Sequence, residues 1–298
     1  MKYSYLSETV RVSKLCFGCE PLGGKDWGKV NIADIDLAIH RSIDLGVNYF
    51  DTADVYGLGQ SEERLSRILG ARRHELVIAT KGGVSWYRGA KTGRALTSLD
   101  SSPKYLGKAI ENSLRRLRLE YLPVYYVHQP DQNTDIRVTF EFLSKLQSKG
   151  KIGLLGCSNY NSKQIALASE VVNLSVVQLP LNILSGSLGK ELIDTCETYN
   201  LKIVAYNVLA GGLLTGKYYE NSKFGVNDRR SRLPLFQGKK FCEAIEQVHA
   251  IEKTAQEKAL TVGQYSINWT LNQPYVASAI TGIKNVQQLE QNIQGVGK

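Results

Sequence analysis

Short apolar segments alternate with longer amphipathic ones along most of the chain. A short apolar run predicts a buried strand, and apolar residues at three- and four-residue spacing predict a helix that packs on it. Eight strands are expected near residues 14–19, 47–51, 76–81, 124–128, 152–159, 175–178, 202–206 and 276–281. Helices are expected near residues 31–45, 61–69, 101–117, 135–149, 162–171, 188–199, 241–257 and 262–271.

This alternation predicts a parallel sheet, and eight such units in about 300 residues indicate a (β/α)8 TIM barrel. We expect residues 1–298 to form a single domain of this kind, with residues 3–13 as an N-terminal β-hairpin at the barrel bottom. An open doubly wound sheet is the alternative. It would carry G-x-G-x-x-G in its first turn between strand and helix, and residues 18–24 lack that spacing.

Two local expectations concern the loops. Ser61 stands where a helix begins, and Glu62 and Glu63 follow it, so we expect Ser61 to cap the helix 61–69. The polar segment that carries Trp86 and Tyr87 is expected to be a long loop.

Composition is typical of a folded globular protein, with 43% hydrophobic and 22% charged residues. No apolar run approaches the ~20 residues that span a bilayer, and residues 1–8 lack the apolar core of a secretory signal, so a cytoplasmic location is expected. Five cysteines, an odd number, argue against a disulfide framework. Cys16 and Cys19 form a C-x-x-C along an apolar strand, without a second pair, which favours ordinary packing over redox or zinc chemistry.

The net charge is +9, and the basic residues are scattered. No nucleic-acid motif accompanies them, so a phosphate-bearing cofactor is the simpler anionic partner. Two denser clusters are interpreted as an exposed helix face and as exposed loop charges, namely Arg115, Arg116 and Arg118, and Arg229, Arg230 and Arg232.

Strand after strand ends in a polar or aromatic residue. In a barrel these ends surround one opening, where side chains stand on a rigid frame. The residues are Asp51, Lys81, His128, Ser158, Asn159, Gln178 and Tyr206, and Tyr56 follows Asp51 on a Gly-rich loop.

Four of these residues suggest acid–base chemistry. A phenol has a pKa near 10 and is a poor acid at neutral pH, but a nearby ammonium lowers that pKa. Lys81 can act in this way on Tyr56, with Asp51 as the ion-pair partner of Lys81. His128 can donate a hydrogen bond to a bound carbonyl oxygen, so Tyr56 could act as general acid on a carbonyl or as base on an alcohol. A purely structural Asp51–Lys81 pair would leave Tyr56 and His128 unexplained.

The run from Asp51 to Gly57, with Ser61 and Glu62 after it, resembles the signature of the aldo-keto reductases. Further segments follow in the family's order, and the resemblance covers essentially the whole chain. They are residues 79–81, 127–131, 156–159, 177–178, 205–207, 211–217 and 282–284, with Gln288, Leu289 and Asn292.

The resemblance implies a catalytic tetrad of Asp51, Tyr56, Lys81 and His128, with Tyr56 as proton donor and no metal. It implies NADPH as cofactor, with NADH as an alternative, and a small carbonyl substrate near Trp27, Tyr56, Trp86 and His128. Lys284 as a contact of the 2′-phosphate would favour NADPH. The implied cofactor residues are Gly18, Asp51, Ser158, Asn159, Gln178, Tyr206, Asn207, Leu209, Gly212, Leu214, Gly216, Lys217, Gly282, Lys284, Gln288 and Asn292.

Three functions agree with these implied catalytic and cofactor residues. The first is reduction of an aldehyde or ketone, including polar or sugar-like carbonyls, by hydride transfer. The second is a cofactor-binding regulatory module, like the channel subunits that resemble the same family. The third is oxidation of a polyol or sugar alcohol with NAD(P)+. The residues do not identify the substrate, the direction of the reaction or the oligomeric state.

Overall fold

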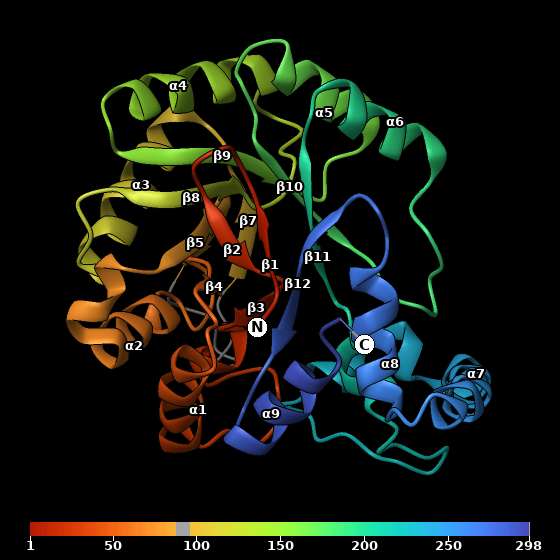
Figure 1. Ribbon diagram of the computed structural model, residues 1–298. Coiled ribbons are helices and arrows are strands. Elements are labelled where there is room, and N and C mark those ends of the chain that lie inside the picture. The colour runs from red at the N-terminus through yellow and green to blue at the C-terminus, as the bar shows by residue number, and fades with distance from the viewer. Residues whose placement is uncertain (88–95, 298) are drawn as a thin grey trace.

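Parallel strands close into an eight-stranded barrel in the computed structural model, which describes residues 1–87 and 96–297 (Figure 1). Around the barrel the order is β10-β11-β12-β3-β4-β5-β8-β9, and β9 pairs with β10 to close it. This confirms the predicted (β/α)8 barrel and excludes the open sheet. The barrel strands are β3 (Leu15–Gly18), β4 (Tyr49–Asp51), β5 (Val77–Gly82), β8 (Leu122–Val127), β9 (Ile152–Ser158), β10 (Val176–Pro180), β11 (Lys202–Tyr206) and β12 (Val276–Gly282).

Helices surround the barrel and bury their apolar faces against it (Figure 1). They are α1 (Ile32–Asp44), α2 (Gln60–Leu69), α3 (Pro103–Leu117), α4 (Ile136–Ser148), α5 (Ser162–Ser169), α6 (Lys190–Thr198), α7 (Gly238–Glu257), α8 (Val262–Leu271) and α9 (Val286–Gln294). The sequence prediction missed α9, which packs between α1 and α8. Its few apolar residues, Val286, Leu289 and Ile293, stand at helical spacing in a Gln-rich segment.

A hairpin of β1 (Tyr3–Tyr5) and β2 (Arg11–Ser13) lies at the end of the barrel where the strands begin (Figure 1, red). Leu6 and Val12 are buried in the same cluster as the residues that fill the barrel interior. The Ser4 hydroxyl donates to the carbonyl oxygen of Ala277, near the start of β12, at 2.6 Å. These contacts confirm the predicted hairpin at the barrel bottom, so the opposite end holds the ends of the strands.

Short 3₁₀ segments lie in several of the loops, and those that follow β3 and β11 make parts of the opposite end of the barrel. The 3₁₀ segments are η1 (Glu20–Gly23), η2 (Gly70–His74), η3 (Ala210–Thr215), η4 (Arg229–Arg232) and η5 (Pro234–Phe236). The long segment between β11 and α7 is anchored by its own apolar cluster, in which Leu213, Phe236 and Phe241 are buried.

The expected loop around Trp86 is wrong, because β6 (Val84–Tyr87) and β7 (Leu96–Leu99) pair as an antiparallel hairpin. Residues 88–95, between the two strands, lie outside the described residues. Leu96 and Leu99 are exposed, so the segment has no buried apolar face that would have marked it as strand. The hairpin is held by pairing, including a hydrogen bond between the hydroxyls of Ser85 and Ser98 at 2.7 Å.

Ser61 does not cap its helix, which is a second correction. Helix α2 begins at Gln60, after Gly59 with a φ of 89°. The buried Ser61 hydroxyl donates to the carbonyl oxygen of Cys19 at 2.8 Å and accepts from the hydroxyl of Thr52 at 2.9 Å. The side chain is used to join the ends of β3 and β4, which a pattern along one helix cannot reveal.

The interpretation of the arginine clusters as exposed charges is also wrong at two positions. Arg116 forms an ion pair with Glu62 at 2.6 Å, with side chains only 11% and 0% exposed. Arg230 is buried and paired with the buried Asp228. Glu62 comes from another helix and Asp228 from the start of the turn that carries Arg230, so the arginines alone gave no sign of burial.

Cys16 and Cys19 are buried and free, and burial raises the pKa of both thiols. A thiol with a raised pKa forms little thiolate, so the structure supports the packing interpretation of the C-x-x-C. In residues 1–87 and 96–297, no helix is long and apolar enough to cross a bilayer.

Candidate active site

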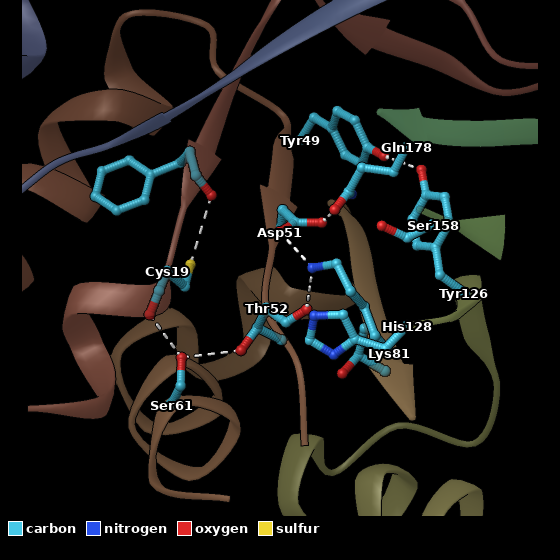
Figure 2. Close-up of polar contacts among 12 residues, drawn as sticks. Cys19, Tyr49, Asp51, Thr52, Ser61, Lys81, Tyr126, His128, Ser158 and Gln178 are labelled. Carbon is cyan, nitrogen blue, oxygen red and sulfur yellow. Dashed lines mark hydrogen bonds and ion pairs between the residues drawn. The ribbon is translucent and has the colours of Figure 1, made fainter. Parts of the chain in front are cut away.

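A buried ion pair lies at the ends of β4 and β5. Lys81 Nζ is 2.6 Å from Asp51 Oδ1, and the two side chains are 0% and 4% exposed. The same ammonium donates to the carbonyl oxygen of Thr52 at 2.8 Å (Figure 2). Neighbouring parallel strands in register place these groups together, since Asp51 stands opposite Ala79, two residues before Lys81. The ammonium is thus held in one position.

Tyr56 and His128 complete the predicted group of four. Lys81 Nζ lies 5.1 Å from the centre of the Tyr56 ring, and the His128 ring lies 5.9 Å from that ring, edge-on. Tyr56 is on the turn between β4 and α2, and His128 follows β8. The backbone N–H of His128 donates to the carbonyl oxygen of Gly82 at 2.8 Å. The structure therefore brings the four residues together, while their catalytic roles stay a prediction.

Burial controls the protonation of both rings. Burial, with the charges of Lys81 and Arg229, lowers the pKa of His128 from 6.5 to about 3, so this imidazole is neutral. Its buried Nδ1 has no hydrogen-bond partner in the described part of the chain. Burial also raises the pKa of Tyr56 well above its usual value, and the carboxylates of Glu20 and Asp51 raise it further. In the chain by itself the pKa of Tyr56 is therefore raised, mainly because burial disfavours the phenolate, and the lowering expected from Lys81 stays a prediction.

A buried polar chain continues from Asp51 into the barrel interior. Gln178 Nε2 donates to Asp51 Oδ2 at 2.8 Å, and Gln178 is also hydrogen-bonded to the Tyr126 hydroxyl. The hydroxyls of Tyr126 and Tyr49 lie 3.1 Å apart (Figure 2). Sequence reasoning missed both tyrosines. Each stands two residues before a predicted site residue, and the two-residue period of a strand puts it on the same side.

The ends of β8, β9 and β11 are linked by side chains as well. Asn159 Nδ2 donates to the carbonyl oxygen of His128 and to the Ser158 hydroxyl, both at 3.0 Å. The Tyr206 hydroxyl donates to Asn159 Oδ1 at 2.6 Å. Ser158, Asn159 and Tyr206, which are predicted to contact the carboxamide and the ring of the nicotinamide, thus lie in one hydrogen-bonded group beside His128. Their binding of a cofactor stays a prediction.

A glycine-rich loop follows β11. Gly211, Gly212 and Gly216 have φ values of 66°, 95° and 73°, a region that favours glycine. Asn207, itself at φ 57°, accepts a hydrogen bond from the N–H of Gly211 at 2.9 Å. Leu214 is buried beneath this loop, Leu209 is half-buried, and the exposed Lys217 follows it. The loop supplies a backbone surface without Cβ atoms at these glycines, which suits close approach by a phosphate.

Three cations gather next to this loop. Lys284 Nζ donates to the carbonyl oxygen of Trp27, and burial together with Arg230 and Lys217 lowers the pKa of Lys284 to about 8. Arg230 is paired with Asp228, so the cluster keeps an excess of positive charge. An anion would relieve the repulsion that lowers this pKa. This donor set fits the phosphate groups of a nicotinamide dinucleotide. Sequence reasoning did not place Arg230 and Asp228 here.

The remaining predicted cofactor residues surround Lys284. Gly18 and Gly282 stand opposite each other on β3 and β12. The N–H of Lys284 donates to Gln288 Oε1 at 3.0 Å, and the four-residue spacing places Asn292 on the same face of α9 as Gln288.

The two tryptophans predicted for the substrate pocket lie on different loops. Trp27 is half-buried, and its backbone pairs with that of Asp228. Trp86 is half-buried on β6. Their contact with a substrate stays a prediction.

Comparisons with known proteins agree with this geometry. The model of the Aldo/keto reductase family matches residues 14–296. An NADP(+) aldo-keto reductase of Schizosaccharomyces pombe is 33% identical, over 93% of this chain and 81% of its own. The L-glyceraldehyde 3-phosphate reductase of Escherichia coli strain K12 is 30% identical, over 99% of this chain and 88% of its own. The structure of a glycerol dehydrogenase from Gluconobacter oxydans superposes with a TM-score of 0.88 at 33% identity, covering 97% and 88% of the two chains.

Proposed function

This chain belongs to the aldo/keto reductase family, and we propose that it reduces a polar aldehyde or ketone with NADPH, using Tyr56 as the general acid. Membership makes it an oxidoreductase that acts on carbonyl compounds with a nicotinamide cofactor. The observation that carries the proposal is the buried Lys81–Asp51 pair, whose ammonium lies 5.1 Å from the Tyr56 ring while His128 lies against the same ring.

Tyr56 is suited to give a proton rather than to take one. Reduction of a carbonyl needs a hydride on carbon, which the bound nicotinamide supplies, and a proton on oxygen. The raised pKa keeps the proton on the phenol until an alkoxide develops. An alkoxide is more basic than a phenolate, so transfer from Tyr56 Oη to this oxygen is favourable. The fixed ammonium of Lys81 then stabilises the phenolate that remains.

His128 is suited to orient the carbonyl. Its lowered pKa keeps the imidazole neutral, so one ring nitrogen carries a proton to donate and the ring brings no charge of its own. The absence of a hydrogen-bond partner for the buried Nδ1, in the part of the chain that the structure describes, leaves this ring available to a ligand.

NADPH is proposed over NADH because of the cations around Lys284. A 2′-phosphate would bring negative charge to Lys284, Lys217 and Arg230, where NADH has only a hydroxyl. The S. pombe relative, whose name specifies NADP(+), supports this choice. Ser158, Asn159 and Gln178 would hold the carboxamide, Tyr206 the nicotinamide ring, and the loop from Asn207 to Lys217 the pyrophosphate.

Oxidation of a polyol is the second candidate, favoured by the similarity to a glycerol dehydrogenase. In that direction Tyr56 must first lose its proton to act as a base. The raised pKa of the phenol opposes this loss. We therefore place reduction first.

The proposal is tested by following NADPH absorbance with a panel of aldehydes and ketones, and NADP+ reduction with glycerol and sugar alcohols. We expect turnover of at least one carbonyl compound, with higher kcat/KM for NADPH than for NADH. Cofactor fluorescence should show binding in the same samples. Binding of NADPH without turnover of any carbonyl or alcohol would contradict the proposal and favour a regulatory module.

A further inference from the structure

One charged pair at the open end of the barrel neither donates the proposed proton nor belongs to the proposed cofactor residues. Glu20 is the first residue of η1, just after β3, and Arg229 is the first residue of η4. Arg229 Nη1 lies 3.0 Å from Glu20 Oε1. The side chains of Arg229 and Glu20 are 48% and 31% exposed, so both keep surface that a ligand can reach.

The loop that carries Glu20 packs directly on the turn that carries Tyr56. A Cβ atom on Gly23 would lie 2.8 Å from the backbone nitrogen of Gly57 and 3.0 Å from the carbonyl carbon of Tyr56. At the start of the same loop, the N–H of Cys19 donates to the carbonyl oxygen of Asp51 at 2.8 Å. The loop that carries Glu20 is therefore packed against Tyr56 and hydrogen-bonded to Asp51, two of the four proposed catalytic residues.

Both charges also act on the proposed catalytic rings. The Glu20 carboxylate raises the pKa of Tyr56, and the Arg229 guanidinium lowers the pKa of His128. Both charges are thus near enough to the two rings to act on a polar group of a carbonyl compound bound there.

A second ion pair joins the same two segments. Arg232 Nη2 lies 2.7 Å from Asp26 Oδ1, and the N–H of Arg229 donates to the carbonyl oxygen of Asp26 at 2.7 Å. The second of these contacts joins two backbones and does not depend on the Arg232 side chain. The Arg232–Asp26 pair thus joins the same two segments as the Glu20–Arg229 pair. Its charges are not among those that shift the pKa of Tyr56 or His128.

We propose that the Glu20–Arg229 pair determines specificity by selecting uncharged hydroxyaldehydes and hydroxyketones over plain or anionic carbonyl compounds. This inference rests on the proposed carbonyl reduction at Tyr56. A carboxylate accepts hydrogen bonds and a guanidinium donates them, so a fixed pair suits neighbouring hydroxyls that do both. A plain alkyl chain would cover these charged groups without replacing their hydrogen bonds to water. An anionic substituent would be attracted by Arg229 but repelled by Glu20.

The test compares kcat/KM for glyceraldehyde and propanal, two aldehydes of three carbons, at saturating NADPH. Their intrinsic reactivities differ, so the measured quantity is the change in the ratio between variants. Glu20→Leu should lower the ratio of glyceraldehyde to propanal on the order of 10-fold to 100-fold, the usual effect of one hydrogen bond to a charged group. The more exposed Arg229→Leu should lower it in the same direction and serves if Glu20→Leu does not fold. Arg232→Leu, which breaks the neighbouring pair, should keep the parent ratio.

An unchanged ratio in both Glu20→Leu and Arg229→Leu would overturn the inference, as would a ratio lowered equally in Arg232→Leu. A higher kcat/KM for glyceraldehyde 3-phosphate than for glyceraldehyde in the parent would also overturn it, in favour of an anion site at Arg229. These outcomes all require an active parent. Failure of the proposed function is different, because the parent would then turn over no carbonyl at all.

Discussion

Removing the ammonium of Lys81 should be among the most damaging changes to stability. In Lys81→Met the Asp51 carboxylate stays buried, with the Gln178 amide as its remaining side-chain donor. Two unit charges 2.6 Å apart attract by about 6 kcal/mol at an effective dielectric constant of about 20. The variant also avoids the cost of burying the Lys81 ammonium, which offsets roughly 2 kcal/mol of the loss. The expected cost is therefore about 4 kcal/mol, within the usual range for breaking a buried pair.

Urea unfolding followed by circular dichroism measures this cost. With a slope of about 3 kcal/mol per molar urea, the midpoint should fall by roughly 1–2 M. Lys190→Met breaks the exposed pair with Asp194 and should leave the midpoint unchanged. The double variant Asp51→Asn/Lys81→Met should recover part of the loss, because no unpaired charge remains buried. A midpoint for Lys81→Met equal to that of the Lys190→Met control would mean that the buried pair does not stabilise the fold.

Two further predictions follow from the pKa shifts. His128 has a pKa of about 3 in the folded chain and 6.5 when unperturbed. Between these two pH values the unfolded state binds a proton at His128 and the folded state does not. The free energy of unfolding therefore falls as pH decreases from about 6.5 to about 3. His128→Gln should remove about 1.4 kcal/mol of this loss per pH unit in urea unfolding between pH 6.5 and 4.5, and identical pH dependence in parent and variant would contradict it. Lys284→Met should weaken NADPH binding, measured by fluorescence, roughly tenfold more than NADH binding. In the parent, NADPH affinity should fall as pH rises through about 8, where Lys284 loses its charge. Equal weakening of NADPH and NADH binding in Lys284→Met would contradict a contact between Lys284 and the 2′-phosphate.

The barrel and the positions of the four proposed catalytic residues could be predicted because both follow from local patterns. Alternating strand and helix signals define the topology, and parallel strands in register bring their carboxyl ends to one opening. A residue at the end of a strand, such as Asp51 or His128, is therefore placed by its position along the chain.

Contacts between loops could not be predicted in this way. Glu20 and Arg229 are 209 positions apart, and their pairing depends on how η1 and η4 fold over the barrel. Ser61 carries the sequence features of a helix cap, yet its hydroxyl joins Cys19 to Thr52. The direction of the Tyr56 pKa shift depends on burial and on distances to several charges, and sequence spacing gives neither.

The single-turnover rate of Tyr56→Phe shows whether Tyr56 supplies the proton to the carbonyl oxygen. The parent and the variant are saturated with NADPH, mixed with an accepted carbonyl compound, and followed by NADPH fluorescence. Tyr160→Phe, which removes a buried phenol outside the proposed site, is the control. We expect unchanged NADPH binding and a hydride-transfer rate about 10²- to 10⁴-fold lower in Tyr56→Phe, with Tyr160→Phe near the parent. A rate for Tyr56→Phe within a few-fold of the parent would contradict Tyr56 as the proton donor.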